Sequence, residues 1–362
     1  MDLVPYLEDL SRRINADEED RLAGSWLSFA DGNFQGNFFS PSRSRPSPPA
    51  IAWPNVNINP CIDDIELMIY RELKGVSDTL AAGKGELLAI RPNYGTGIIP
   101  SMYGAEVFVM PEKTDTLPCT RPLTGAAVKD ILDRGEMDFS RALAGRVFEF
   151  VNCWAELSLP WELVRRYVHV YNPDLQGPFP LVDMLWGSDV YTDIFDEPEA
   201  VQAAAAFFAD VIIEFLGKYH ALCPPFDACH SVEWGLLHSG AVIIRNDAAM
   251  NISGEMYREF VMPYDQKVID AFGGGMHFCG KGDHYIAHVS EIKGLSTINM
   301  SQPEYNNMET IYRNTIDKGM VIIGMPRPEV ERAEATGRNL RGRVHSGASL
   351  AAWADARKAS PL

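Results

Sequence analysis

The alternation of short apolar runs with helical segments along residues 85–346 restricts the fold of this chain more than any other feature. Continuous apolar runs bounded by turn residues are typical of buried parallel strands. They occur at 87–90, 241–244, 296–300 and 320–324, and a run at 167–171 alternates in hydrophobicity. Amphipathic helical patterns separate these runs. Strands that alternate with helices pair in parallel, so the pattern predicts an α/β protein.

The number of repeats favours a barrel. With further strands at 276–279 and 342–346, the strand–helix unit recurs roughly eight times, and residues 179–186 fit either a strand or a helix. A chain of 362 residues has room for one large domain of this kind. We therefore predict a (β/α)8 barrel in preference to an open doubly wound sheet. Gly95-Thr96-Gly97 is a weak dinucleotide-binding pattern, because the third glycine and the acidic ribose partner are absent.

The region before the barrel has a different composition. Residues 1–83 are predicted to form an N-terminal extension, and the barrel is assigned to 84–362. Six prolines between residues 41 and 60 exclude a helix interior and predict an extended segment that wraps around the protein. Phe34, Phe38, Phe39 and Trp53 lie in or beside this segment, so we expect it to pack on the barrel.

Charge and cysteine content narrow the functional classes. The net charge is −17 and no Lys/Arg cluster is present, which argues against nucleic acid and anionic membranes as partners. No uninterrupted apolar run reaches the roughly 18 residues of a membrane span. The first residues lack the basic and apolar regions of a secretory signal. Six scattered cysteines suggest reduced thiols, and we expect a cytoplasmic protein.

A His-x-Cys pair is the first candidate for chemistry. Side chains at i and i+2 of a strand point to the same face, so His277 and Cys279 are expected to present an imidazole and a thiolate side by side. These two groups make half of a zinc site. The alternative is a small buried strand whose His and Cys only pack, because motifs this short often occur by chance.

Polar residues follow several of the predicted strands, where the active site of a (β/α)8 barrel is found. They are Arg91, Asn93, Tyr94 and Thr96; Arg245, Asn246 and Asp247; Asn299, Ser301, Gln302 and Glu304; and His345 and Ser346. We expect these groups to converge on one mouth. A helix cap or a loop hydrogen bond is the alternative for each, and for Asn246 and Asn299 it is the more ordinary interpretation.

The stretch from Asn246-Asp247 through Ser253–Tyr264, followed by His277-Phe278-Cys279-Gly280, resembles the uroporphyrinogen decarboxylase superfamily. The resemblance covers about residues 165–325 and implies a (β/α)8 barrel. The arginine-rich N-terminal loop with which true decarboxylases grip the porphyrinogen has no counterpart here. The chain is more similar to the zinc-dependent methylcobamide:thiol methyltransferases of the superfamily.

The methyltransferase branch holds zinc through His-x-Cys and a later Cys. His277 and Cys279 match the first two ligands, but no Cys follows Cys279. The resemblance places the third ligand on the last strand, where His345 lies, and imidazole is an acceptable zinc ligand. Glu304 is the oxygen alternative, because related cobalamin-independent methionine synthases add a Glu to such a set.

The resemblance implies methyl transfer to a small thiol that zinc holds deprotonated. The methyl group is expected from a methyl-corrinoid on a partner protein, because the chain lacks the Asp-x-His-x-x-Gly motif of corrinoid binding. Asp247 and Arg245 are the expected catalytic residues. Arg91, Tyr94 and Asn246 are expected to bind substrate, with Arg91 pairing with an anionic end such as a sulfonate or carboxylate.

Two other functions stay open at this stage. One is a metal-free, decarboxylase-type lyase that acts on a small acid or a tetrapyrrole-like substrate, with Asp247 moving protons. The other is a non-catalytic barrel that binds a corrinoid partner, which the missing third Cys favours. Related barrels are often dimers, so a second copy of the chain is a further expected partner.

Overall fold

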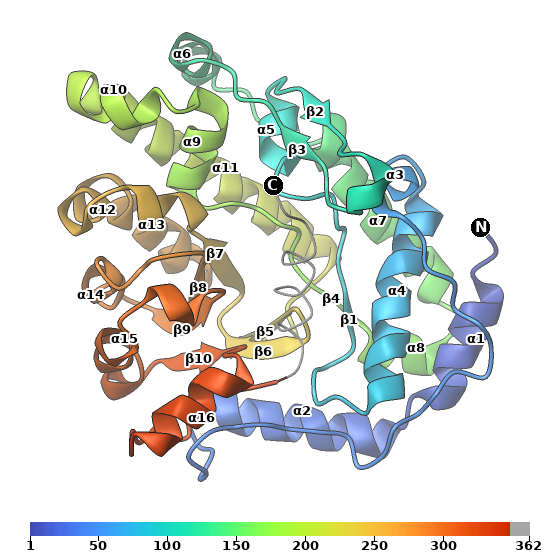
Figure 1. Cartoon of the computed structure of the whole chain (residues 1–362). Coiled ribbons are helices and arrows are strands. Elements are labelled where there is room, and N and C mark those ends of the chain that lie inside the picture. Colours follow the sequence, from blue (N-terminus) through green and yellow to red (C-terminus); the bar gives the residue numbers. More distant parts are fainter. Residues whose placement is uncertain (348–362) are drawn as a thin grey trace.

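The computed structural model describes residues 1–347 and shows a mixed α/β fold whose main strands pair in parallel (Figure 1). Helices lie around the outside and the strands lie inside them. The largest sheet contains β7 (Val242–Arg245), β8 (Gly274–Phe278), β9 (Leu295–Met300) and β10 (Val321–Ile323), in sequence order. A second parallel pair joins β1 (Ala89–Ile90) to β4 (His169–Val170).

Single parallel bridges extend the large sheet at both edges. Gln176, which follows β4, pairs with Arg245 of β7. At the other edge Ile322 pairs with Val344, and His345 pairs with Phe39. The last predicted strand, 342–346, is therefore present only as these two bridges. The described strands form one four-stranded and three two-stranded sheets instead of one closed sheet.

Two antiparallel hairpins were not predicted. One joins β2 (Val107–Phe108) to β3 (Cys119–Thr120), and the other joins β5 (His230–Glu233) to β6 (Leu236–Ser239). The second hairpin turns at Trp234-Gly235, where both residues have positive φ, of 54° and 78°. A two-residue turn with two positive φ angles matches the right-handed twist of a hairpin. It usually contains Asn-Gly, so Trp at its first position is unusual.

The structure contains every helix predicted between the strands, together with short helices at 98–102, 162–167 and 190–196 that were not predicted. Residues 179–186, which the sequence left open, are helical and belong to α9. The helices of this part are α5 (Ile98–Met102), α6 (Gly125–Arg134), α7 (Ala142–Ser158), α8 (Glu162–Tyr167), α9 (Pro178–Trp186), α10 (Val190–Asp196), α11 (Pro198–Leu222), α12 (Gly254–Phe260), α13 (Met262–Phe272), α14 (Ile286–Val289), α15 (Met308–Asn314) and α16 (Arg327–Ala335). Short 3-10 turns follow two strands of the large sheet: η2 (Asp247–Asn251) after β7 and η3 (Pro303–Tyr305) after β9.

The N-terminal residues form α1 (Val4–Arg13), α2 (Ala16–Ala30), α3 (Ile58–Cys61) and α4 (Ile65–Ala82), joined by a mostly irregular segment from 31 to 57. This segment packs on the rest of the protein as expected: Phe39 stacks on Phe29, and Trp53 stacks on Tyr70. A buried ion pair between Arg43 and Glu19 fixes it to α2, with Nη2 and Oε2 2.6 Å apart.

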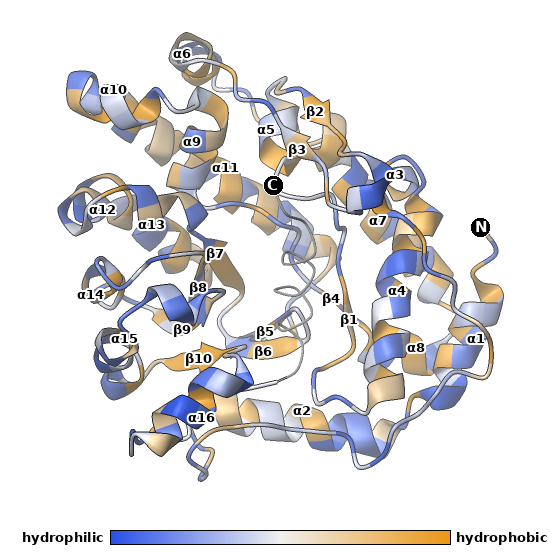
Figure 2. Ribbon diagram, in the orientation of Figure 1, coloured by the Kyte–Doolittle hydropathy of each residue, from blue (hydrophilic) through white to orange (hydrophobic). Residues whose placement is uncertain are grey.

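The large sheet separates two hydrophobic clusters. Ile244, Met276 and Ile298 pack toward the surrounding helices. Ile243, Val321 and Ile323 alternate with them and pack on the inner side, against α2 and the β5–β6 hairpin, whose hydrophobic and hydrophilic residues both appear in Figure 2. Since alternate residues of a strand share a face, Arg245, His277 and Asn299 also point to the inner side, beyond this inner cluster.

Helix α11 is long and apolar enough to cross a membrane by length and composition, with a mean hydropathy of 1.6 over its most apolar stretch. Its sequence is not an uninterrupted apolar run, because Gln202, Asp210 and Glu214 lie within it. Half of that stretch is buried inside the protein, where α11 packs on α9 and α13. The core helix of a folded domain meets the same criterion, so this helix is weak support for a membrane span.

Candidate functional site

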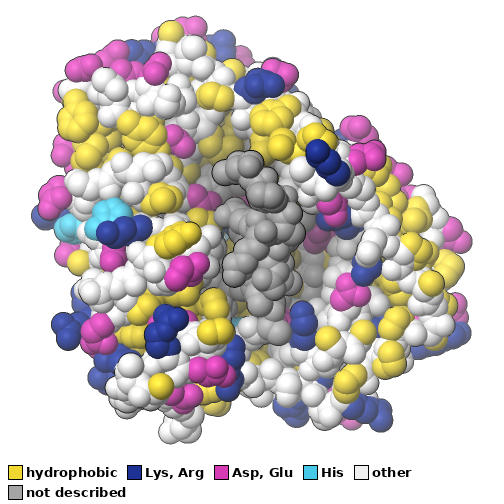
Figure 3. Space-filling model, in the orientation of Figure 1, with side chains coloured by type: hydrophobic (Ala, Val, Ile, Leu, Met, Phe, Trp, Pro, Cys, Tyr) yellow, Lys and Arg dark blue, Asp and Glu magenta, His cyan; other side chains and the backbone are white. Residues whose placement is uncertain are grey.

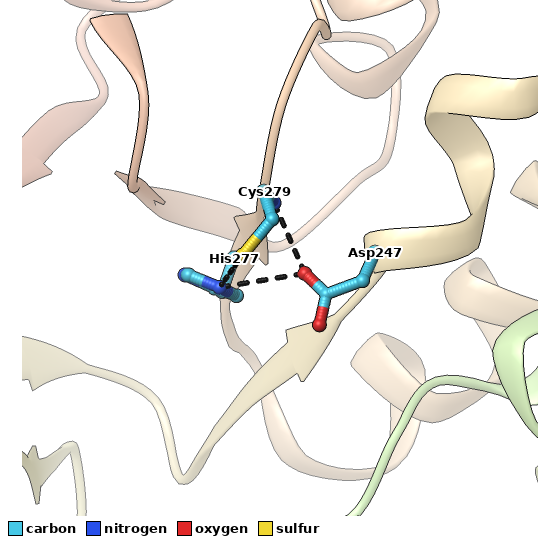
Figure 4. A group of neighbouring side chains, drawn as sticks. All are labelled: Asp247, His277 and Cys279. Atoms are coloured by element: carbon cyan, nitrogen blue, oxygen red, sulfur yellow. Dashed lines mark hydrogen bonds and ion pairs between the residues drawn. The ribbon is translucent and has the colours of Figure 1, made fainter. Parts of the chain in front are cut away.

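His277, Cys279 and Asp247 come together where β7 and β8 end (Figure 4). His277 Nε2 lies 3.4 Å from Cys279 Sγ and 3.5 Å from Asp247 Oδ1. The three ligand atoms all lie within 4.8 Å of one another. The predicted His-x-Cys pair therefore shares a face, and Asp247, which the sequence assigned to catalysis, lies beside it.

Strand register explains why these residues meet. Arg245 pairs with His277 across β7 and β8, and His277 pairs with Asn299 across β8 and β9. Asp247 begins η2 two residues after Arg245, so its side chain returns over the end of β8. The N–H of Cys279 donates to Asp247 Oδ1 at 3.0 Å, and the amide of Gln176 donates to Oδ2 at 3.4 Å. These bonds hold the carboxylate toward His277.

Asn299 fixes the proton of His277. Its Nδ2 donates to the carbonyl of Ile323 at 2.8 Å, which leaves Oδ1 to accept from His277 Nδ1 at 2.5 Å. With the proton on Nδ1, Nε2 presents a lone pair to Asp247 Oδ1, which is itself an acceptor. A metal ion between Nε2 and Oδ1 would be bound by both lone pairs.

The donor set fits zinc. Nitrogen, sulfur and oxygen from His, Cys and Asp are its usual ligands, and bond lengths of about 2.0–2.3 Å put tetrahedral ligand atoms about 3.3–3.7 Å apart. The separations of 3.4 and 3.5 Å from Nε2 fall in that range. A hydrogen bond from the second ring nitrogen, here Nδ1 to Asn299, is the usual support of a metal-bound His.

A buried ionic network borders the three residues. Asp174 pairs with Arg245 Nε at 3.0 Å and with Arg91 Nη1 at 3.4 Å. Burial raises the pKa of Asp174, but Arg245 and Arg91 outweigh it, so its pKa is lowered. Arg245 Nη2 also lies 3.2 Å from Glu233. Burial raises the pKa of Glu233 to about 7 despite Arg245.

Trp234 connects this network to His277. Its ring centroid lies 5.5 Å from the His277 ring and 5.1 Å from the guanidinium carbon of Arg245. The left-handed backbone that positions it costs a non-glycine residue roughly 1–2 kcal/mol. Strain of this kind is retained mostly at functional sites. The hairpin and Trp234 were missed because the run 230–239 has no Asn-Gly turn to reveal it.

Two predicted metal ligands lie elsewhere. His345 is buried, and its ring packs on Trp26 with centroids 4.6 Å apart. Its Nδ1 accepts from the N–H of Gly324 at 3.1 Å. Glu304 is exposed in η3. Within residues 1–347, the residue that completes a three-ligand group with His277 and Cys279 is Asp247. Neither His345 nor Glu304 does so.

Two predicted substrate-binding residues are enclosed by the fold. Tyr94 is fully buried in the helix-side core. Asn246 points to the opposite side of β7 from Arg245 and donates to Asp265, which also accepts from the hydroxyl of Tyr257 at 3.0 Å. Ser253 caps α12, with its Oγ 3.2 Å from the backbone N of Met256. The site is thus supported from behind by Ser253, Tyr257 and Asn246. Arg91 alone of the predicted substrate-binding residues lies in the ionic network.

The buried carboxyl group of Asp265 is expected to make the stability of the protein depend on pH. Burial raises the pKa of Asp265 to about 7. Asp265 Oδ1 and Asn246 Oδ1 have no hydrogen-bond partner in the described chain, and a proton on Asp265 would let it donate. The folded state therefore keeps a proton on Asp265 that the unfolded state loses near pH 4. The contribution of Asp265 to stability is lost as the pH rises from about 4 to 7.

Asp265→Asn is expected to remove this dependence. Its free energy of unfolding, relative to wild type, should rise by about 1.4 kcal/mol per pH unit between pH 5 and 7 in urea titrations. Burial lowers the pKa of His169, His220 and His238 to about 4. These buried imidazoles make the protein more stable as the pH rises toward 6.5, which is the opposite of the effect of Asp265. That contribution is common to both proteins and cancels in the difference. A difference independent of pH would contradict a protonated Asp265.

A surface hollow of about 550 Å³ lies away from these residues, between α5, α6 and the 136–141 loop. Of its four charged side chains, Arg141 pairs with Glu136 and Asp138, and Arg134 forms no ion pair with them. The hollow holds no group of metal-binding or catalytic side chains, so the candidate site is the one at the ends of β7 and β8.

A comparison with models of known protein families finds no match for this chain, and a search of curated proteins finds none.

Proposed function

We propose that this protein is a zinc-dependent methyltransferase that methylates a small thiol, with zinc held by His277, Cys279 and Asp247. The observation that carries the proposal is the convergence of three ligand atoms of the right type and spacing at the ends of adjacent strands. Asp247 would replace the third Cys of the family that the sequence resembles. Three protein ligands leave a fourth position for the substrate, as in catalytic zinc sites.

We further propose that the fold is a (β/α)8 barrel of the uroporphyrinogen decarboxylase superfamily. The parallel order β7–β8–β9–β10, extended by bridges to the β4 segment and to Val344 and His345, supports this assignment. So does the position of the three candidate ligands, since barrel enzymes carry their active sites at the C-terminal ends of strands.

Zinc bound at this site would lower the pKa of a substrate thiol so that it reacts as a thiolate. The residues of the chain bind and orient that substrate. The guanidinium of Arg91 pairs with Asp174 at 3.4 Å, and its other N–H groups are the proposed contacts for an anionic end of the substrate. Arg245 has fewer N–H groups available for a substrate, because it also contacts Glu233 and the carbonyl of Pro173.

A methyl-corrinoid on a partner protein is the proposed methyl donor. The corrinoid would supply the methyl group for the new C–S bond and would keep the electron pair of the Co–C bond that is given up. The surface near the site suits contact with a protein: Met250 in η2 is 42% exposed and Tyr305 in η3 is 62% exposed. Figure 3 shows further hydrophobic side chains over α10, where Phe195 is 72% exposed.

The test combines metal content with turnover. Protein purified without chelator is expected to hold about one zinc per chain. Methylcobalamin and a panel of small thiols should then yield methyl thioethers and cob(I)alamin, which is followed by its absorbance under anaerobic conditions. A chelated sample should lose activity and regain it with zinc. Absence of zinc after reconstitution, or zinc with no methyl transfer to any thiol, would overturn the proposal.

Asn299→Ala provides a prediction specific to zinc. The change leaves all three ligands in place but removes the acceptor that holds the proton on His277 Nδ1. Loss of such a support typically lowers metal affinity 10–100-fold, so competition with a fluorescent chelator should show a decrease of about that size. Asn299→Asp keeps an acceptor and should retain most of the affinity. Equal affinities in all three proteins would show that this hydrogen bond does not support a metal ligand.

Decarboxylation without metal is the second candidate function. Arg91 with N–H groups to spare can hold a carboxylate, and Glu233, whose pKa is raised by burial to about 7, can exchange a proton near neutral pH. Release of CO2 from small acids by the chelated protein would favour this function.

A further inference from the structure

Glu86 is a buried carboxylate with no partner. It lies just before β1, and 5% of its surface is exposed. Neither Oε1 nor Oε2 has a hydrogen-bond partner in the described chain, and no ion pair is formed by this residue there. Burying a carboxylate without a partner is costly, and native proteins rarely do so. Both oxygens therefore indicate a missing donor.

The space beside Glu86 is bounded by His345 and Gly347. A Cβ atom built on Gly347 would lie 3.3 Å from Glu86 Oε1 and 3.1 Å from His345 Nε2. Glu86 Oε1 and His345 Nε2 therefore both lie beside Gly347, and a side chain at residue 347 would crowd both of them. His345 Nδ1 accepts from the N–H of Gly324, so Nε2 carries the ring proton and is a donor.

Within residues 1–347, no ion pair neutralises Glu86. Arg43 is the nearest guanidinium: its Nη1 donates to the backbone carbonyl of Glu86 at 3.1 Å. Its charge is already matched by Glu19, which accepts from Nε and Nη2 at 2.8 and 2.6 Å. Burial lowers the pKa of His345 to about 3, so this imidazole is neutral.

The space lies on the same inner side as the candidate metal site. The strand order from β8 through β9 and β10 to His345 places it three strands from His277, about 14 Å along the sheet at the usual spacing. The N–H of Leu87, next to Glu86, donates to the carbonyl of Gly235 at 2.8 Å, and Gly235 follows Trp234 in the hairpin turn. Glu86 is therefore a separate point of contact for a ligand in the same mouth.

We propose that Glu86 and His345 form a second subsite that binds a monovalent cation, either the ammonium group of an organic ligand or an alkali ion. A primary ammonium group has three N–H donors and can serve both carboxylate oxygens at once. The Nε2–H of His345 then donates to an acceptor atom of the ligand or of a water beside it. This subsite does not depend on zinc or on methyl transfer.

Thermal unfolding of the full chain tests the proposal at constant ionic strength. Methylammonium chloride is expected to raise the unfolding temperature in a saturable manner, by about 1–3 °C, because it binds the folded state only. Tetramethylammonium has the same charge and no N–H donor, and it should have no such effect. Potassium chloride distinguishes the two kinds of cation. An equal saturable rise with potassium would identify an alkali ion, and not an ammonium group, as the ligand.

Two variants separate charge from space. Glu86→Gln removes the charge and should abolish the rise, and its unfolding temperature without added cation should be at least that of wild type, since no unpaired charge is buried. Gly347→Ala keeps the charge but places a methyl group about 3.3 Å from Glu86 Oε1 and 3.1 Å from His345 Nε2, where it would obstruct a ligand, and it should abolish the rise as well. Glu304→Gln, an exposed acid, is the control and should respond like wild type. No saturable rise in wild type with either cation, or a rise that Glu86→Gln retains, would overturn the proposal.

Discussion

Replacing His277 with alanine is expected to lower zinc affinity by more than about 100-fold and to abolish methyl transfer, since loss of a ligand exceeds the 10–100-fold cost of losing its support. His277 is central to the group because both short separations, to Cys279 Sγ and to Asp247 Oδ1, start from its Nε2. Asp247→Ala should have an effect of the same order, because it removes the only oxygen ligand of the group. Zinc per chain, measured by mass spectrometry after gel filtration, checks both.

Two further variants test the choice of third ligand. Glu304→Ala and His345→Gln change the residues that the family resemblance put in that place. Glu304 is exposed and His345 is bound to Gly324, so both variants should keep about one zinc per chain. Full zinc in Asp247→Ala together with loss in either of these two would show that the third ligand is not Asp247. Zinc content in the His345 variant is compared only for protein that elutes and melts as folded.

The strand ends could be predicted because hydrophobic periodicity is local. The runs at 241–244, 276–279, 296–300 and 320–324 became β7, β8, β9 and β10 within a few residues. The pairing of His277 with Cys279 follows from the two-residue period of a strand alone. Only the approach of Asp247 needed the structure, since it depends on how η2 turns back over β8.

What the sequence did not reveal depends on contacts between distant segments. Trp234 and Glu233 reach the site on a hairpin whose turn, Trp234-Gly235, does not have the usual composition. His345 was chosen as a ligand because the last strand should end at the mouth. It lies on that strand position, but Trp26 and Phe39 from the N-terminal segment pack around its ring. No pattern within 342–346 indicates those contacts.

Asn246 shows why a motif does not fix the role of each residue. It precedes Asp247, so the strand alternation that turns Arg245 to the inner side turns Asn246 outward, to Asp265 and Tyr257. The residue therefore holds α12 and α13 against β7 and cannot reach a substrate on the inner side. The Asn246–Asp247 part of the resembling stretch thus combines one support residue with one candidate ligand.

Arg245→Met is expected to cost about 3–5 kcal/mol of unfolding free energy, which is typical when one partner of a buried ion pair is removed. Arg245 is 3% exposed and pairs with both Asp174 and Glu233. In the variant, Asp174 keeps its ion pair with Arg91. Glu233 loses its ion pair with Arg245 and has no other among the described residues. Urea denaturation at pH 8 measures the loss. Arg341→Met, which removes an exposed pair with Asp317, should cost less than about 1 kcal/mol.

The pH dependence of this loss identifies its cause. With Arg245 absent, the pKa of Glu233 rises further above its wild-type value of about 7, and the folded variant takes up a proton there. A raised acid pKa favours the folded state at low pH, so the variant should be destabilised less at pH 6 than at pH 8. Adding Glu233→Gln to Arg245→Met should recover part of the loss at pH 8 and remove this pH dependence. A loss that is the same at both pH values, and that the second change does not reduce, would mean that Arg245 stabilises the fold through its packing on Trp234 and not through its charge.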